Sequence, residues 1–200
     1  MGNAESESNC YDELAFPKWR LFNLVTAMAQ DDTPNQQRAN AAARYKPQRV
    51  RLLLVAQTPP ANAPRDPPRY FYFEKVSKHD DLFRGVIKAI LGVEPIRHQK
   101  ASQLAMLRDQ GVFLIDLKPD PSDPLPLDSF VPALIERCRQ LLPDHIILMK
   151  ADVYDAAFAA AHSANLPVID ARIPFPGSGR QAEFAQAMSR ALNVAKWSLR

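Results

Sequence analysis

Cysteine is scarce in this chain of 200 residues, and its scarcity excludes several kinds of site. The two cysteines, Cys10 and Cys138, lie far apart, so neither a disulfide framework nor a four-cysteine iron–sulfur cluster is supported. The histidines lack the spacing of metal ligands; they are His79, His98, His145 and His162. We therefore expect a protein of the reducing cytoplasm, with no metal and no other cofactor.

Long apolar runs and strong charge are also missing. No apolar stretch approaches the roughly 20 residues that cross a membrane, so we expect no membrane partner. The N-terminal sequence MGNAESESNCYDEL has neither the basic flank nor the apolar core of a signal peptide. The net charge of +3 permits an anionic partner such as nucleic acid but does not require one. Six glycines against eighteen prolines indicate stiff loops, which favour preformed sites.

The stretch from Arg49 to Phe73 is the most informative part of the chain. Its residues 50–55 are almost all β-branched or leucine and lack helical spacing, which predicts a strand buried on both faces of a parallel sheet. The strand ends at Gln57, because the prolines that follow Thr58 have no backbone N–H. The aromatic run 70–73 comes next. Ligands of open α/β sheets bind outside the carboxyl ends of the strands, so we predict the first wall of a binding site here.

The remaining elements predict an α/β fold. Further strands are expected at 112–117, 145–149 and 166–170. Amphipathic spacing predicts helices at 80–92, 100–110, 130–142, 153–164 and 183–197. This alternation is typical of a three-layer α/β/α domain with a four-stranded, mainly parallel sheet, here over residues 48–200.

An N-terminal extension is expected before this domain. Residues 1–10 are polar and acidic, which predicts disorder. Residues 11–47 are expected to be a helical extension, with one helix from Tyr11 to about Asp31. The alanine-rich part at 35–46 is either a second short helix or a linker.

Three short motifs follow the strands in order. They are Ala56-Gln57-Thr58-Pro59-Pro60, IILMKA at 146–151, and Phe175-Pro176-Gly177-Ser178-Gly179. In order and spacing, the chain from about Arg49 to Leu192 resembles the uracil-DNA glycosylase-like superfamily. That family has Gly-Gln-Asp-Pro-Tyr after the first strand, a downstream aromatic that stacks on a flipped-out base, and a His-Pro-Ser loop that presses on DNA. The resemblance implies a divergent member that binds DNA or a nucleobase and excises a damaged base by hydrolysing its N-glycosidic bond.

The chain departs from the family at two motif positions. Thr58 stands where a water-activating aspartate or an asparagine is usual, and its hydroxyl is too weakly acidic to be a general base near neutral pH. Phe175 stands where the family has a histidine that stabilises the departing base. The candidate catalytic residues are therefore Gln57, Thr58 and Asp116. The last ends a buried strand, where desolvation raises a carboxyl pKa.

Each of these residues also has a structural interpretation. Gln57 either contacts the edge of a base or caps the next turn, and Asp116 either acts in acid–base chemistry or caps a neighbouring loop. Phe71 and Phe73 are candidates for the stacking platform, with Tyr72 facing the other way if the run is a strand. The alternative is that residues 70–73 are an edge strand or part of the core.

Phosphate-binding candidates come from the late loop and from the end of the third strand. A nest of backbone amides at the start of the last helix fits the glycines of this loop, which gives the candidates Pro176, Gly177, Ser178, Gly179 and Arg180. The alternative is a plain N-cap by Ser178. Lys150 is a further candidate, although a lysine is more often solvated at the surface.

Two other functions remain open at this point. One is a non-catalytic member of the same fold that binds single- or double-stranded nucleic acid. The other is a small-molecule enzyme on a flavodoxin-like sheet.

Overall fold

The computed structural model describes residues 33–61, 69–75, 80–177 and 179–199. The predicted N-terminal disorder, the helix expected from Tyr11 and the candidate Ser178 lie outside these residues. The chain divides after Thr33, and nearly all of the described residues belong to the unit Pro34–Arg200.

A three-stranded parallel sheet forms the centre of this unit. Its strands are β1 (Leu52–Ala56), β2 (Val112–Asp116) and β3 (His145–Leu148), in the order β2-β1-β3. In register, Leu52 of β1 faces Val112 on one side and His145 on the other. All five residues of β1 are buried, because neighbouring strands cover both edges and helices cover both faces. The predicted strand, buried on both faces of a parallel sheet, is confirmed.

The fourth predicted strand, 166–170, forms only isolated bridges within the described residues. Val168 bridges to Ile146, and Ile173 bridges to Met149, both in parallel. The pairing is short: Ile146 donates to the carbonyl of Pro167 (2.9 Å) and accepts from Ile169 (2.8 Å), whereas the N–H of Ala171 turns back to the carbonyl of Ile169 (2.9 Å). The sheet therefore has three strands where four were predicted, because the local turn at Ala171 ends the ladder after one bridge.

Six α-helices and two 3-10 turns surround the sheet in the described residues. The helices are α2 (Pro34–Arg44), α3 (Asp81–Leu91), α4 (Lys100–Asp109), α5 (Val131–Leu141), α6 (Ala151–Ser163) and α7 (Gln181–Val194). The 3-10 turns span Arg97–Gln99 and Leu127–Phe130. All five helices predicted after residue 80 are confirmed, and α2 shows that residues 35–46 are largely helix. α3 ends at Gly92 (φ 67°), as expected for a left-handed C-cap.

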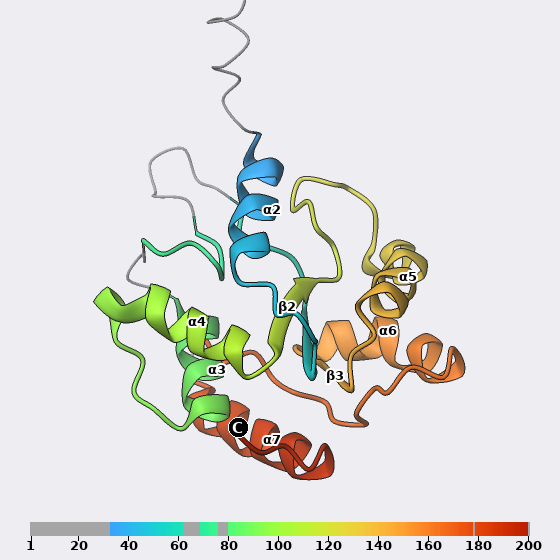
Figure 1. The fold of residues 1–200 in the computed structure, drawn as a ribbon. Helices are drawn as coiled ribbons and strands as arrows, with labels where there is room; N and C mark the ends of the chain where they lie inside the picture. The colour runs from blue at the N-terminus through green and yellow to red at the C-terminus, as the bar shows by residue number, and fades with distance from the viewer. Residues whose placement is uncertain (1–32, 62–68, 76–79, 178, 200) are drawn as a thin grey trace, which may run out of the picture. The chain divides into compact units, whose positions relative to one another are not determined.

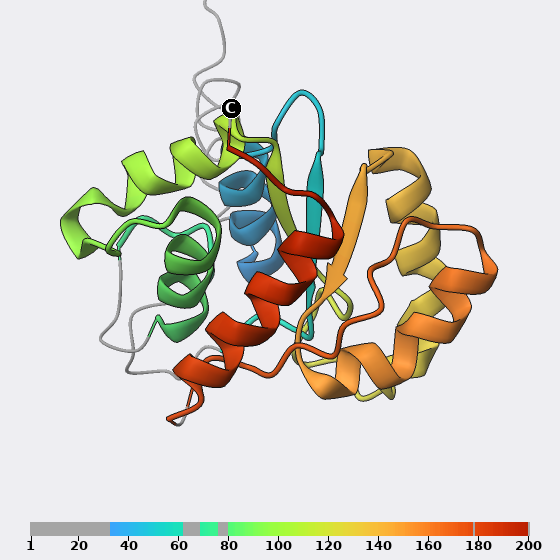
Figure 2. The ribbon, with the colours of Figure 1, turned by 90° about the horizontal axis from the view of Figure 1, so that it is seen from below.

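The helices cover the sheet from both sides (Figures 1 and 2). α3 and α7 pack on each other on one side, and α5 and α6 do so on the other. α2 lies beside the edge strand β2 in both views. No helix of the described residues is long and apolar enough to cross a membrane. This arrangement leaves the carboxyl ends of β1 and β3 next to each other.

Candidate functional site

The order in which strands are added to the sheet reverses at β1. The chain leaves β1 toward β2 on one side and then crosses to β3 on the other. In doubly wound sheets, such a switch point opens a crevice outside the carboxyl ends of the two strands. A cavity of about 500 Å³, here called the β1 cavity, lies at this point. Among the described residues, its walls come from 56–61, 69–71, the start of α3, Lys100 and the residues after β3.

Aromatic rings form part of these walls. Phe71, Tyr70 and Phe175 line the β1 cavity. The ring of Phe71 is buried and held edge-on by Tyr72 and Phe83, with centroids at 5.0 and 6.1 Å. Phe175 is 44% exposed. Phe71 thus lines the cavity with a buried ring, its role as a stacking platform stays a prediction, and Phe175 is a second aromatic wall that sequence reasoning had noted only as a missing histidine.

The other two members of the aromatic run do not line this cavity. Residues 70–73 form a turn closed by the N–H of Phe73 on the carbonyl of Tyr70 (3.1 Å), so Phe71 and Phe73 do not share a strand face. Phe73 packs edge-on against Tyr70 at 5.3 Å. The hydroxyl of Tyr72 donates to the carbonyl of Leu114 (3.0 Å) and accepts from its N–H (2.7 Å). Burial raises the pKa of Tyr72 well above its ordinary value.

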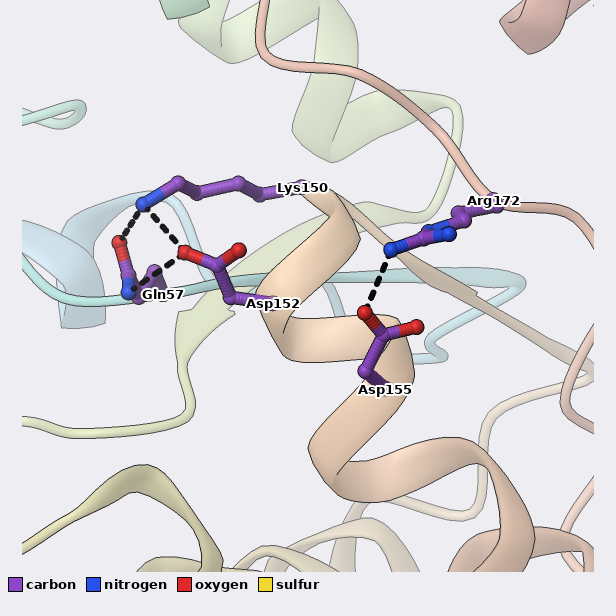
Figure 3. Close-up of polar contacts among 5 residues, drawn as sticks. All are labelled: Gln57, Lys150, Asp152, Asp155 and Arg172. Atoms are coloured by element: carbon purple, nitrogen blue, oxygen red, sulfur yellow. Dashed lines mark hydrogen bonds and ion pairs between the residues drawn. The ribbon is translucent and has the colours of Figure 1, made fainter.

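Polar groups from β1 and β3 meet at the mouth of the cavity. Figure 3 shows Gln57, Lys150 and Asp152 pointing toward one another. Lys150 donates to Gln57 Oε1 and forms an ion pair with Asp152 Oδ2 at 2.9 Å. Gln57 Nε2 donates weakly to the same carboxylate at 3.4 Å. The hydrogen bond from Lys150 and its charge hold the pKa of Asp152 below its usual range. We call these residues the Gln57–Lys150–Asp152 cluster.

Thr58 contributes an unusual polar atom to the same wall. It lines the β1 cavity, and its Oγ1 is buried without a hydrogen-bond partner among the described residues. Buried hydroxyls are nearly always satisfied, so this orphaned hydroxyl is an unusual feature of the residue that follows Gln57. The predicted pair Gln57 and Thr58 is therefore brought together here.

Asp116 ends β2 and pairs in register with Ala56, the residue before Gln57. It is 9% exposed, and burial raises its pKa to about 7 against the opposing charges of Arg137 and Arg38. The raised pKa confirms the expectation from sequence. However, Asp116 is not among the residues that line the β1 cavity, and Arg38 places it near α2.

Charged residues that sequence reasoning missed do line the cavity. Asp80 and Asp81 stand at the start of α3, and Lys100 begins α4. Lys100 is 1% exposed and forms an ion pair with Asp80 at 2.5 Å, with its ammonium 4.8 Å from the ring of Phe83. Burial lowers the pKa of Lys100, and Asp80 opposes that shift. The only sequence signal was the acidic pair at a helix start, which is common for electrostatic reasons alone.

The late loop faces a second cavity. Pro176, Gly177 and Gly179 do not line the β1 cavity, and Gly179 adopts φ 82° in the turn before α7. Arg180 forms an ion pair with Glu183 at 2.7 Å. Arg180 and Lys150 are among the residues that line a second cavity of about 500 Å³ beside α7, here called the α7 cavity. The predicted phosphate candidates are thus divided: the two cations line a cavity, and the glycines only shape the turn.

Among the described residues, no group of three or more His, Cys, Asp or Glu side chains is placed to hold a metal ion. No protein-family model matches this chain, and no curated protein or solved structure matches it. What the site does must therefore follow from its own geometry.

Proposed function

We propose that the chain binds a nucleobase of a nucleic-acid strand in the β1 cavity. The observation that carries the proposal is the pairing of aromatic walls, Phe71 and Phe175, with hydrogen-bonding groups at the ends of β1 and β3. A base site needs a flat apolar surface and donors or acceptors for the base edge. Both lie at the switch point of the sheet, which is where ligands of such sheets bind.

The Gln57–Lys150–Asp152 cluster favours a base that offers a carbonyl oxygen. The ammonium of Lys150 only donates and the carboxylate of Asp152 only accepts, so together they fix the Gln57 amide with Oε1 toward Lys150. The second hydrogen on Nε2 remains as a donor. Deaminated bases carry a carbonyl in place of an amino group. The cluster therefore supports a base with a carbonyl at its edge, and the deaminated bases uracil, hypoxanthine and xanthine each gain such a carbonyl.

The loop after β1 argues against a flavodoxin-like small-molecule enzyme. Phosphate binding at such a loop depends on successive backbone N–H groups. Pro59 and Pro60 occupy this loop and have no N–H. A phosphate site directly after β1 is thus disfavoured. We therefore favour nucleic-acid binding over a flavodoxin-like small-molecule enzyme.

A carboxylate inside the cavity supports base excision as the chemistry. Asp80 is held in its ion pair with Lys100, whereas Asp81 lines the cavity with no such partner among the described residues. A carboxylate beside the sugar stabilises the positive charge that develops on it and orients the attacking water. We assign this role to Asp81 in place of Asp116. In the reaction, water supplies a hydroxyl to C1′ and a proton to the departing base.

The test is a panel of end-labelled oligonucleotides that carry uracil, hypoxanthine, xanthine or an alkylated base, with an undamaged strand as reference. We expect tighter binding of a strand with a deaminated base. Gln57→Ala should weaken that preference by about tenfold, because one hydrogen bond to the base is lost. Gln140→Ala on α5 is the matched control, since it removes the same amide far from the cavity. Equal affinity for every strand would overturn the proposal.

The same samples, treated with alkali, report excision as strand cleavage at the damaged base. Asp81→Asn should lower the cleavage rate by roughly 10²-fold or more, while Asp116→Asn should leave it largely unchanged. The reverse order would return the catalytic role to Asp116. Base-dependent binding without cleavage would establish the non-catalytic alternative.

A further inference from the structure

The α7 cavity adjoins the β1 cavity. The two share Lys150 and Phe175 as lining residues, so one ligand can contact both sides of the Lys150 side chain. The rest of the lining comes from the start of α6, from the segment before the late loop and from one face of α7. Within the described residues, nothing in the base-binding proposal uses this second cavity.

Positive charge predominates in the α7 cavity. Its cationic lining residues are Lys150, Arg172, Arg180 and Arg190, against the acidic Asp152 and Glu183. Arg172 pairs with Asp155 at 2.5 Å, as Figure 3 shows, and Arg180 pairs with Glu183. Arg190 makes no hydrogen bond or ion pair with any residue that the structure describes. The cavity thus holds a guanidinium that is available to an anion.

Lys150 adopts a backbone conformation that a side chain makes costly. Its φ of 81° and ψ of 137° lie where glycine is at ease and a residue with a Cβ is strained. The surrounding backbone enforces this geometry: the N–H of Lys150 donates to the carbonyl of Ile173 (2.8 Å), and its carbonyl accepts from Val153 and Tyr154 (both 3.1 Å). From this strained backbone position the Lys150 side chain lines both cavities.

The ammonium of Lys150 can still take an anion. It has three N–H donors, of which Gln57 and Asp152 use two. Its ion pair with Asp152 is partly exposed to solvent, which weakens the hold on the side chain. A phosphate oxygen could therefore accept the third N–H without breaking the cluster.

From these observations we propose that the α7 cavity is a phosphate subsite. Lys150 and Arg190 bind the backbone phosphate next to the nucleotide whose base lies in the β1 cavity. This inference rests on the proposed base-binding function and adds the path of the strand, which passes Phe175 from one cavity to the other. The ligand class is a nucleotide within a strand, bound through base and phosphate together.

Two probes separate the subsite from the base cavity. An oligonucleotide with a tetrahydrofuran abasic analogue has phosphates and no base at the site, and a free deoxynucleoside such as deoxyuridine has a base and no phosphate. Arg190→Ala should weaken binding of the abasic strand by about tenfold at low salt and leave deoxynucleoside binding unchanged. Arg139→Ala on α5, which removes the same charge elsewhere, is the matched control and should change neither.

Lys150 is tested by a pair of substitutions and two measurements. Lys150→Gly relieves the strain and Lys150→Ala keeps it, so the glycine variant should melt at a higher temperature than the alanine variant. Both should bind the abasic strand about tenfold more weakly than the unmodified chain. Unchanged abasic-strand affinity in Arg190→Ala and in both Lys150 variants would overturn the subsite. Absence of deoxynucleoside binding in the unmodified chain would instead count against the base cavity, which keeps the two failures distinct.

Discussion

Asp116 shows at the scale of one residue how burial alone perturbs a carboxyl group. A raised pKa is a common mark of catalytic residues, and sequence reasoning selected Asp116 on that expectation. The shift is present, yet its first cause is burial at the end of β2, and the residue does not line the β1 cavity. The raised pKa of Asp116 therefore affects the stability of the folded chain.

The pH dependence of that stability can be predicted with its sign. The pKa of Asp116 is about 7 in the folded chain and near its ordinary value of 3.8 in the unfolded chain, so folding takes up a proton between these values. The free energy of unfolding should fall as pH rises through this window. The Asp116→Asn variant has no such proton to lose. When the pH is raised from about 5 to about 8, the free energy of unfolding of the unmodified chain should therefore fall by roughly 2–4 kcal/mol relative to that of the variant.

Denaturant unfolding at the two pH values measures this difference. Asp128→Asn, at an exposed position in the 3-10 turn before α5, is the control and should show no such change. If the difference in free energy of unfolding between the Asp116 variant and the unmodified chain were the same at both pH values, titration of Asp116 would not contribute to the pH dependence of stability.

At the scale of elements, the aromatic segment 69–75 closes one edge of the sheet. β2 is an edge strand, and Leu114 presents an N–H and a carbonyl that no strand pairs. The hydroxyl of Tyr72 satisfies both groups. Tyr72 thus makes the two hydrogen bonds that a neighbouring strand would otherwise make. Because its side chain is used in this way, Tyr72 does not line the β1 cavity although Phe71 does.

Tyr72→Phe tests this edge function. The substitution leaves two buried backbone groups of Leu114 without partners, which should lower the free energy of unfolding by about 1–3 kcal/mol. Affinity for deoxynucleosides should stay the same, since Tyr72 does not line the β1 cavity. Tyr154→Phe, which loses an exposed hydrogen bond to Asp170, is the control for thermal or denaturant unfolding. A loss of affinity without a loss of stability would restore Tyr72 as a base contact.

At the scale of the whole molecule, the modest charge limits how the chain can bind a polyanion. The net charge is +3, and most cations around the two cavities already have acidic partners. Binding should therefore involve few phosphates. Plotted as log affinity against log salt concentration, single-strand binding should have a slope of magnitude about 2–3, because each neutralised phosphate contributes roughly 0.7.

Titrations at several salt concentrations between about 50 and 200 mM give this slope. Arg190→Ala should reduce its magnitude by about one contact. A slope as steep as that of proteins that grip many phosphates would place the main nucleic-acid surface elsewhere on the chain.

Much of the fold and part of the site followed from local sequence. The apolar run at β1, the amphipathic periods of five helices and the prolines after Gln57 each reflect interactions within a few residues, so the strand ends could be placed in advance. Gln57, Thr58, Phe71 and Lys150 were named because each follows a strand or lies in the aromatic run. The fourth strand failed because the local turn at Ala171 ends the ladder after one bridge, which apolar composition does not reveal.

The sequence by itself determined the elements and the edge of the sheet at which polar side chains gather, because periodicity and proline act through the backbone nearby. Only the tertiary structure decided which of those side chains share a cavity. Asp81 and Phe175 come from segments distant in the chain, and Asp116 does not line the β1 cavity although its register partner Ala56 does. Side-chain neighbourhood depends on how distant elements pack, and that information lies in no single stretch of residues.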